Sequence, residues 1–160
     1  MEMIRNSAKA LIYHHSRLLL NSHLDSAGNL YYDLPGGGQH PYETMEEAVV
    51  REVLEETGLT VEPVRFAALA EEIFTDPDMR ARWPEYCHRC LHIFQVKLLS
   101  EAAREKSEMD IQQTGSAWFT PEEAEGLPLV PLQLRGRVRE VLEAPAPVYL
   151  GSLRRDEVCM

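Results

Sequence analysis

Hydrophobic and polar positions along the chain follow two periods, which predict strands in some segments and helices in others. Residues 7–15 (SAKALIYHH) and 17–24 (RLLLNSHL) have the composition of two strands joined by a tight turn. Residues 60–74 carry strand signals around Pro63 and predict one or two strands. Residues 86–99 (YCHRCLHIFQVKLL) form the clearest strand signal, because the run is long and rich in β-formers.

Helical spacing begins after Thr44. Thr44 and Glu47 have the spacing of a capping box, in which each side chain satisfies a free backbone N–H of the first turn. Gly58 is a suitable C-terminal stop. Between these positions, apolar-leaning residues recur at helical spacing and form one stripe: Val49, Val50, Val53, Leu54 and Thr57. The pattern predicts an amphipathic helix with one side against a core.

The C-terminal part of the chain repeats the change from strand to helix. A short strand is predicted at residues 116–119, followed by a helix that Thr120 caps and Pro121 begins. Residues 133–144 predict a last amphipathic helix, and residues 145–160 are expected to be a C-terminal tail.

Three segments are predicted to be irregular. Residues 25–29 (DSAGN) and 75–85 consist of turn-forming and polar residues, and the second loop could overhang a site. Residues 36–38 are three consecutive glycines, which are expected to prevent regular structure. With no internal repeat or linker, residues 1–160 are expected to form a single mixed α/β domain.

Charge and cysteine content limit the function classes. The net charge of -10 and the pI of about 5.0 argue against extended nucleic-acid binding, which needs many basic contacts to phosphate. An acidic protein can still act on a small anion if a divalent cation mediates the contact. No apolar run approaches the ~20 residues of a membrane span, and no secretory signal is apparent. Three cysteines make a disulfide framework improbable, so a cytoplasmic location is expected.

The predicted helix after Thr44 concentrates negative charge on one side. At about 100° per residue, Glu52, Glu55 and Glu56 fall within an arc of roughly 100° opposite the apolar stripe. Like charges at these spacings weaken a helix. Two interpretations follow from the residues alone: a solvated acidic face, or a site for a hard cation such as Mg²⁺ or Mn²⁺, which prefers oxygen ligands.

The residues around these glutamates match a known pattern. Gly37, five residues, Glu43, seven residues and then residues 51–59 (REVLEETGL) agree with the Nudix box, G-x5-E-x7-R-E-U-x-E-E-x-G-U, at every fixed position. The chain therefore resembles a Nudix hydrolase, and the resemblance extends over most of residues 5–143. It implies the Nudix fold, an α/β/α sandwich in which a mixed β-sheet lies between helices.

The resemblance also implies roles for box residues. It assigns a divalent cation, Mg²⁺ or Mn²⁺, to four oxygen donors: the carboxylates of Glu52, Glu55 and Glu56 and the backbone carbonyl of Gly36. Arg51 and Glu43 are expected to form an ion pair that fixes the helix against the glycine loop and orients Glu52. Such supporting contacts typically change affinity or activity 10–100-fold.

The general base remains open between several carboxylates. In some family members it corresponds to Glu52, and in others it comes from a loop outside the box. Ala117 stands where some relatives carry a metal-binding acid, so this outside contribution is unassigned. Glu72, Glu108 and Asp110 are the candidates for it.

The substrate implied by the resemblance is a small nucleoside diphosphate joined to another group. Phe74 occupies the place of a proline typical of ADP-ribose hydrolases, and no other subfamily signature is present. A nucleotide sugar such as ADP-ribose and a nucleoside triphosphate, including an oxidised one, both remain open. The AEEIF run is similar to an acid-bearing strand of ADP-sugar hydrolases, so Glu72 is a substrate-binding candidate together with Gly37, Gly38 and His88. The rival class is a non-catalytic Nudix-like sensor or scaffold, and the family leaves a homodimer open.

A zinc site at Cys87 and Cys90 is disfavoured. On a strand these two residues point to opposite faces and cannot reach one ion without a bend. His88, Cys90 and His92 share a face of the predicted strand, which could line the substrate cleft.

Overall fold

The computed structural model describes residues 2–100 and 113–156. The strands are β1 Arg5–His14, β2 Arg17–Leu24, β3 Leu30–Asp33, β4 Gly36–Gly38, β5 Thr60–Phe74, β6 His88–Ser100, β7 Gln113–Phe119, β8 Leu129–Val130 and β9 Val148–Arg155. The α-helices are α1 Met45–Thr57, α2 Pro77–Arg82, α3 Pro121–Glu125 and α4 Val138–Glu143, and the short 3-10 helices are η1 Pro84–Tyr86 and η2 Leu132–Leu134. In the described part of the chain, no helix is both long and apolar enough to cross a membrane.

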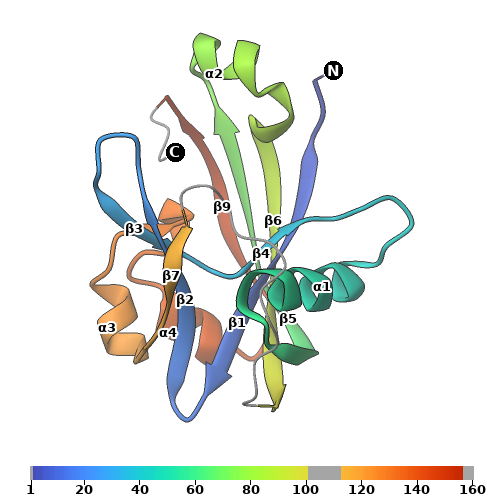
Figure 1. Cartoon of the computed structure of the whole chain (residues 1–160), viewed down its shortest axis with the longest axis vertical. Coiled ribbons are helices and arrows are strands. Elements are labelled where there is room, and N and C mark those ends of the chain that lie inside the picture. The colour runs from blue at the N-terminus through green and yellow to red at the C-terminus, as the bar shows by residue number, and fades with distance from the viewer. Residues whose placement is uncertain (1, 101–112, 157–160) are drawn as a thin grey trace.

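The strands form a mixed sheet in the order β8-β3-β2-β1-β6-β5-β9. Strand β1 pairs with β2 beside their turn, where Tyr13 lies opposite Leu18, and with β6 in parallel along its length. The strands β1 and β2 then diverge, as Figure 1 shows, and β4 pairs with β1 instead. This divergence matters for function because it brings the glycine segment between the two parts of the sheet.

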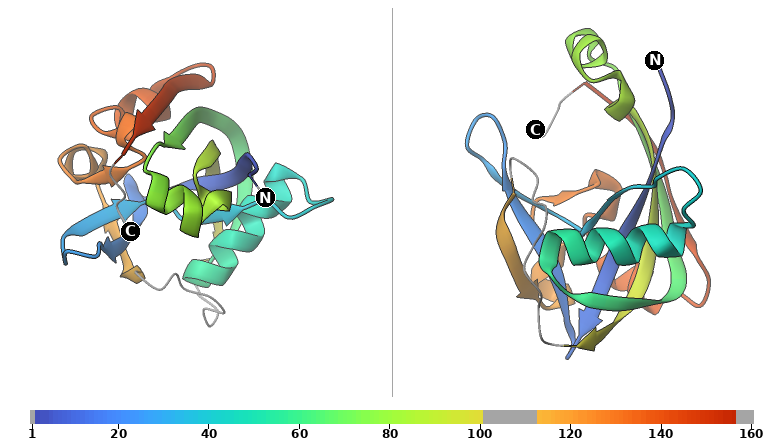
Figure 2. Two further views of the ribbon diagram at one scale, coloured as in Figure 1. Left: turned by 90° about the horizontal axis from the view of Figure 1, so that it is seen from above. Right: turned by 45° about the vertical axis from the view of Figure 1, so that its right-hand side comes forward.

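Two hydrophobic clusters cover opposite faces of the sheet. Alternation along β1 sends Ala8, Ala10 and Ile12 into the cluster beneath α1, and Leu11 into the cluster that includes residues of α3 and α4. Figures 1 and 2 show α1 on one side of the sheet and α3 and α4 on another. The predicted mixed sheet between helices is therefore confirmed.

Helix α1 begins and ends where its caps predict. The Thr44 side chain accepts a hydrogen bond from Glu47 N at 3.1 Å, and the Glu47 carboxylate accepts one from Thr44 N at 2.9 Å. Gly58 adopts a left-handed φ of 75° and ends the helix. Of the predicted stripe, Val49 and Val53 are buried, while Val50 and Leu54 are half-buried.

The prediction of irregular structure at residues 36–38 is wrong, because these glycines form strand β4. Gly36 lies opposite Lys9 of β1, and a Cβ on Gly36 would lie only 2.1 Å from the carbonyl oxygen of Ala8. With a φ of 138°, Gly36 adopts a backbone conformation that other residues rarely take. Glycine is needed here because it lets two backbones approach closely.

Several predicted boundaries also change. Residues 60–74 form one strand, and the predicted loop 75–85 contains α2, which Asp76 caps. The predicted helix 133–144 is shortened to α4, with η2 before it. The expected tail 145–160 includes β9, which pairs in parallel with β5. Tertiary pairing supplies the partners that local sequence does not reveal.

Candidate active site

Arg51 of α1 is the centre of a cluster of charged side chains from α1 and the loop before it. Its Nε and Nη2 donate to Glu43 Oε1 and Oε2 at 2.6 and 3.0 Å. Its Nη1 donates to Glu52 Oε1 at 2.7 Å and to Glu55 Oε2 at 3.1 Å. Its Nη2 also donates to the carbonyl of Gly38 at 2.9 Å. The hydrogen bonds from Arg51 lower the pKa of Glu43 to about 2, so this carboxylate stays ionised.

Glu52 lies against the glycine strand. A Cβ on Gly37 would lie 2.6 Å from Glu52 Oε2, so a larger residue here would displace the carboxylate from its present position. The Glu52 side chain is 13% exposed. Gly37, at the start of the box, therefore allows the Glu52 carboxylate of α1 to lie close to the β4 backbone.

Glu56 is the most buried of the three predicted ligands. Its Oε2 accepts hydrogen bonds from Asn21 Nδ2 at 2.9 Å and from Gly36 N at 3.0 Å. Burial raises its pKa to about 7; Lys9 opposes this shift and the charge of Asp33 adds to it. A carboxyl group that changes protonation near neutral pH is typical of functional sites.

Asn21 connects Glu56 to strand β7. Its Oδ1 accepts a hydrogen bond from Ser116 Oγ at 2.7 Å, and the two residues face each other in the β2–β7 register. Asn21 is 1% exposed. Neither residue stands out in the sequence as part of a site, although Asn21 interrupts an apolar run in residues 17–24.

Lys9 reaches the same place from the opposite strand. Its Nζ donates to the carbonyls of Gly36 at 3.0 Å and Leu34 at 3.3 Å, and to Asp33 Oδ2 at 3.4 Å. The Lys9 side chain is 14% exposed. The signal in the sequence is a single lysine between Ala8 and Ala10 in a strand that is otherwise mostly buried.

Asp33 is held on its other side by a histidine. His23 Nε2 lies 2.8 Å from Asp33 Oδ1, and the His23 ring stacks on Tyr31 with 5.0 Å between ring centres. Burial alone would raise the pKa of Asp33, but the charge of Lys9 and the contact with His23 outweigh it and lower the pKa. Asp33 is thus an ionised carboxylate fixed between two basic side chains.

The oxygen atoms at this place fit a hard cation chemically. Within residues 2–100 and 113–156, no three His, Cys, Asp or Glu side chains are grouped so that they could hold a metal ion. Arg51 instead holds Glu52 and Glu55, while Glu56 points to the Gly36 amide. However, Glu52, Glu56 and the Gly36 carbonyl all lie along residues 36–37 and are all oxygen donors, the type that Mg²⁺ and Mn²⁺ prefer.

Two of the predicted substrate-binding residues lie elsewhere. Glu72 is fully buried, and its carboxylate is paired with Arg89 and, at 3.5 Å, with Arg155. Glu72 lies opposite Arg89 of β6, and Lys9 lies opposite Ile93 of the same strand. Arg89 and Ile93 are four residues apart, which is about 13 Å along a strand, so Glu72 is distant from Lys9.

His88 lies next to Arg89 on β6, and its Nε2 is 2.9 Å from Glu71 Oε2. Gly37 and Gly38 do lie at the glutamates, whereas Glu108 and Asp110 lie outside the described residues. The structure therefore brings together the box residues and Gly36, but not Glu72 or His88.

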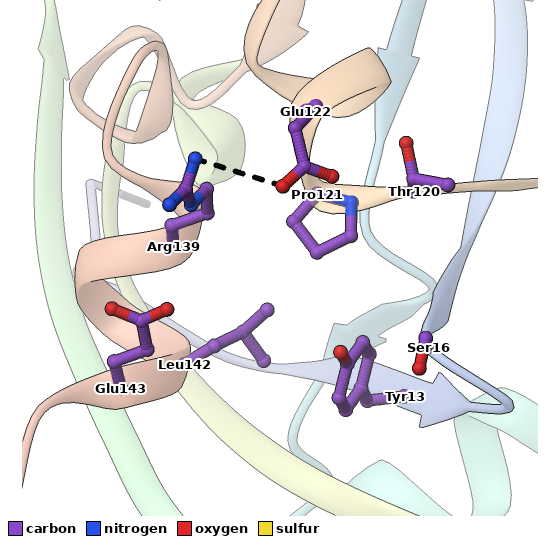
Figure 3. Close-up of a pocket in the computed structure, with 8 residues that line it drawn as sticks. All are labelled: Tyr13, Ser16, Thr120, Pro121, Glu122, Arg139, Leu142 and Glu143. Atoms are coloured by element: carbon purple, nitrogen blue, oxygen red, sulfur yellow. Dashed lines mark ion pairs between the residues drawn. The ribbon is translucent and has the colours of Figure 1, made fainter.

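Two cavities lie away from the glutamates. Figure 3 shows one of about 340 Å³ between α3, α4 and the β1–β2 turn, where Arg139 Nη1 is 3.6 Å from Glu122 Oε1 above Leu142 and Tyr13. The other, of about 400 Å³, lies beside residues 2–4, α2 and the start of β6. Neither is lined by a carboxylate of the Nudix-like box, so the chemistry of the site is defined by its side chains and not by these cavities.

Comparison with known proteins agrees with the geometry. A family model for the NUDIX domain matches residues 3–144. A NUDIX hydrolase from Nitrosomonas europaea is similar in structure, with 19% identity, 89% of this chain and 90% of that chain covered, and a TM-score of 0.68. A MutT NUDIX hydrolase from Burkholderia pseudomallei has 25% identity, covers 91% of this chain and 100% of its own, and has a TM-score of 0.64.

An ADP-ribose pyrophosphatase from Streptococcus suis is also similar, with 20% identity, 91% of this chain and 98% of that chain covered, and a TM-score of 0.61. The family model extends over most of the chain and includes the complete box of residues 37–59. The chain therefore belongs to the Nudix hydrolase family.

Proposed function

We propose that this chain is a metal-dependent hydrolase that cleaves a diphosphate linkage in a small nucleoside diphosphate derivative. In this reaction a water oxygen forms a bond to one phosphorus while the bond from that phosphorus to the bridging oxygen breaks. A bound Mg²⁺ or Mn²⁺ would neutralise phosphate oxygens and lower the pKa of the attacking water. The observation that carries the proposal is the convergence of the Glu52 and Glu56 carboxylates on the backbone of Gly36 and Gly37.

The cation would be held by Glu52, Glu55, Glu56 and the Gly36 carbonyl. Glu56 supports this role because one oxygen is fixed by Asn21 and Gly36 N, which leaves Oε1 available. Glu52 and Glu55 share one guanidinium nitrogen, Arg51 Nη1, so both carboxylates already lie within reach of a single positive charge. A divalent cation near Arg51 Nη1 would contact the carboxylates of Glu52 and Glu55.

Arg51 and Glu43 act as positioning residues in this proposal. Glu43 receives two hydrogen bonds from Arg51 and one from His40 N at 2.9 Å, so the loop before α1 is attached to the helix. Gln39 Nε2 donates to the Glu43 carbonyl at 2.6 Å and completes this attachment. A rigid loop keeps Gly37 and Gly38 at a constant distance from the carboxylates, as in-line attack requires.

We assign the general base to Glu52. Its carboxylate lies directly over the Gly37 backbone, where the reacting phosphorus would be expected beside the cation. Glu72 is the weaker candidate because two guanidinium groups hold its carboxylate. The proton leaving water would then move to a carboxylate oxygen of Glu52, and the bridging oxygen would leave as a phosphate oxygen.

The substrate class is proposed as a nucleotide sugar such as ADP-ribose or a nucleoside triphosphate. One structural relative, named an ADP-ribose pyrophosphatase, supports the first of these, and the complete Nudix box is compatible with either. We further infer a single domain, since one family model matches residues 3–144. We also infer a cytoplasmic protein, because the free thiols of Cys87 and Cys90 suit a reducing compartment. A homodimer remains compatible with the family.

The decisive experiment is a substrate panel with product identification. Nucleotide sugars, nucleoside triphosphates and oxidised triphosphates would be incubated with metal-free protein, with and without added Mg²⁺, in water enriched in ¹⁸O. Mg²⁺-dependent turnover with ¹⁸O in one phosphate product is expected. Thermal stabilisation by a nucleotide without any turnover would instead favour the non-catalytic sensor.

A further inference from the structure

The ammonium group of Lys9 is enclosed by oxygen atoms. The Gly36 carbonyl lies 3.0 Å away, the Leu34 carbonyl 3.3 Å and Asp33 Oδ2 3.4 Å. These atoms are called the oxygen cage below. An ammonium has three N–H donors, and the cage offers an acceptor for each of them.

The strand arrangement explains why this lysine points inward. Lys9 lies opposite Gly36 in the β1–β4 register, and its neighbours Ala8 and Ala10 fill the core on the α1 side. Lys9 therefore projects to the other face, the face of Leu11. A lysine that is 14% exposed and bound to two backbone carbonyls is not a mobile surface charge.

The cage is itself anchored in the protein. Asp33 is held by His23, whose side chain is 4% exposed, and Asp33 faces Asn21 in the β2–β3 register. The charge of Lys9 lowers the pKa of Asp33 and opposes the upward shift of Glu56. Lys9 thus interacts electrostatically with the carboxylates of both Asp33 and Glu56, which flank the glycine strand.

The oxygen cage has the same types of donor atom as a metal-cation site. Two carbonyls and a carboxylate are hard oxygen donors, which a divalent cation would also accept. Here a covalently attached monovalent cation already binds them. The Gly36 carbonyl accepts from Lys9, and its second lone pair could bind a cation on the side of α1.

We propose that Lys9 is a built-in cation of the site: its ammonium retains the oxygen cage and excludes a divalent cation from it. The inference rests on the proposed function, because it concerns the number of cations beside the same glutamates. Divalent cations are then restricted to the side of Glu52, Glu55 and Glu56. Lys9 is a positioning residue in this role, acting through the Gly36 carbonyl and Asp33.

The test counts bound Mn²⁺ in metal-free full-length protein by electron paramagnetic resonance. Lys9→Ala vacates the cage, and Lys97→Ala removes an exposed lysine of β6 as the matched control. The Lys9→Ala variant is expected to bind one more Mn²⁺ equivalent than the wild type, and Lys97→Ala the same number as the wild type. An equal number in Lys9→Ala and wild type would overturn the proposal.

A second measurement on the wild type keeps the test decisive if Lys9→Ala does not fold. The chain has three lysines, so ¹⁵N-lysine labelling gives few ammonium signals, and Lys97→Ala and Lys106→Ala assign the two that do not belong to Lys9. The Lys9 ammonium signal is expected to persist, protected from exchange, when Mg²⁺ is saturating. Its loss on adding Mg²⁺ would show that the metal displaces Lys9.

Failure of this inference is distinguishable from failure of the proposed function. Wild-type protein that binds Mn²⁺ and hydrolyses a panel substrate, with no extra equivalent in Lys9→Ala, refutes only the role of Lys9. Wild-type protein that binds no Mn²⁺ and turns over nothing refutes the proposed function, and this inference with it.

Discussion

Two clusters of glutamate and arginine lie in this protein, and they have opposite charge balances. On α1, one arginine, Arg51, serves the carboxylates of Glu43, Glu52 and Glu55. On β5, one carboxylate, that of Glu72, is paired with two arginines. The first cluster joins three carboxylates to one guanidinium, whereas the second joins one carboxylate to two guanidinium groups.

Under the proposed function, this difference separates the candidate active site from a structural connection. Glu72 joins three neighbouring strands, because Arg89 lies on β6 and Arg155 on β9, and both guanidinium carbons lie 5.3 Å from the Phe74 ring centre. The β5 cluster needs no further ion to balance a carboxylate. The α1 cluster gathers three carboxylates around one guanidinium beside the Gly38 carbonyl, an arrangement that a cation would stabilise.

The largest expected effect is on catalysis at α1. Glu52→Gln and Glu56→Gln should each lower kcat by roughly 10²–10³-fold, because each removes charge that stabilises the transition state through the cation. Steady-state kinetics with the best panel substrate measures this, and circular dichroism checks that the fold survives. Glu122→Gln, an exposed carboxylate of α3, is the control. Near-normal turnover in either variant would show that its assignment is wrong.

The second largest effect is expected on stability, when a substitution removes the carboxylate of the β5 cluster. Glu72→Gln should lower the free energy of unfolding by about 3 kcal/mol, because Arg155 and Arg89 lose their charged partner. Urea denaturation measures the loss, while kcat and KM of the folded protein should stay close to wild type. A raised KM with unchanged stability would instead support the prediction that Glu72 binds substrate.

A pH series sharpens the comparison at Glu56. Because burial raises its pKa from 4.5 to about 7, the folded state holds this proton more tightly than the unfolded state. The free energy of unfolding of metal-free protein should therefore fall as pH rises from about 4.5 to 7, by on the order of 3 kcal/mol, and then level off. The Glu56→Gln variant should lose this fall, and an identical pH profile in wild type and variant would contradict the assignment.

A smaller effect on kcat/KM is expected when the Arg51 guanidinium is replaced by another positively charged group of different geometry. Arg51→Lys keeps the positive charge but cannot donate to Glu43, Glu52 and the Gly38 carbonyl at once. We expect kcat/KM to fall 10–100-fold and Mn²⁺ affinity to change with it. Arg137→Lys, whose guanidinium pairs with Glu140 on the surface of α4, is the control.

Much of α1 could be predicted from the sequence because its signals are local. The capping box of Thr44 and Glu47 and the stop at Gly58 depend on residues within one helical turn, and all are observed. The order of charges from Arg51 to Glu56 likewise determines which side of the helix they share.

Other contacts at the site could not be predicted because they join residues distant in the chain. Asn21 and Glu56 are 35 positions apart, and Ser116 and Asn21 are 95 apart. These pairs meet only after β2, β7 and α1 are aligned, and strand register has no short-range signature in the sequence.

By itself the sequence determined the family, the helix with its caps and the side on which Glu52, Glu55 and Glu56 lie, since all three follow from spacing along one segment. Only the tertiary structure decided that Gly36 to Gly38 form a strand, that Lys9 reaches the Gly36 carbonyl and that Glu72 is enclosed by two arginines. The physical reason is that hydrogen bonding and burial between strands depend on which segments become neighbours, and local propensity does not specify those neighbours.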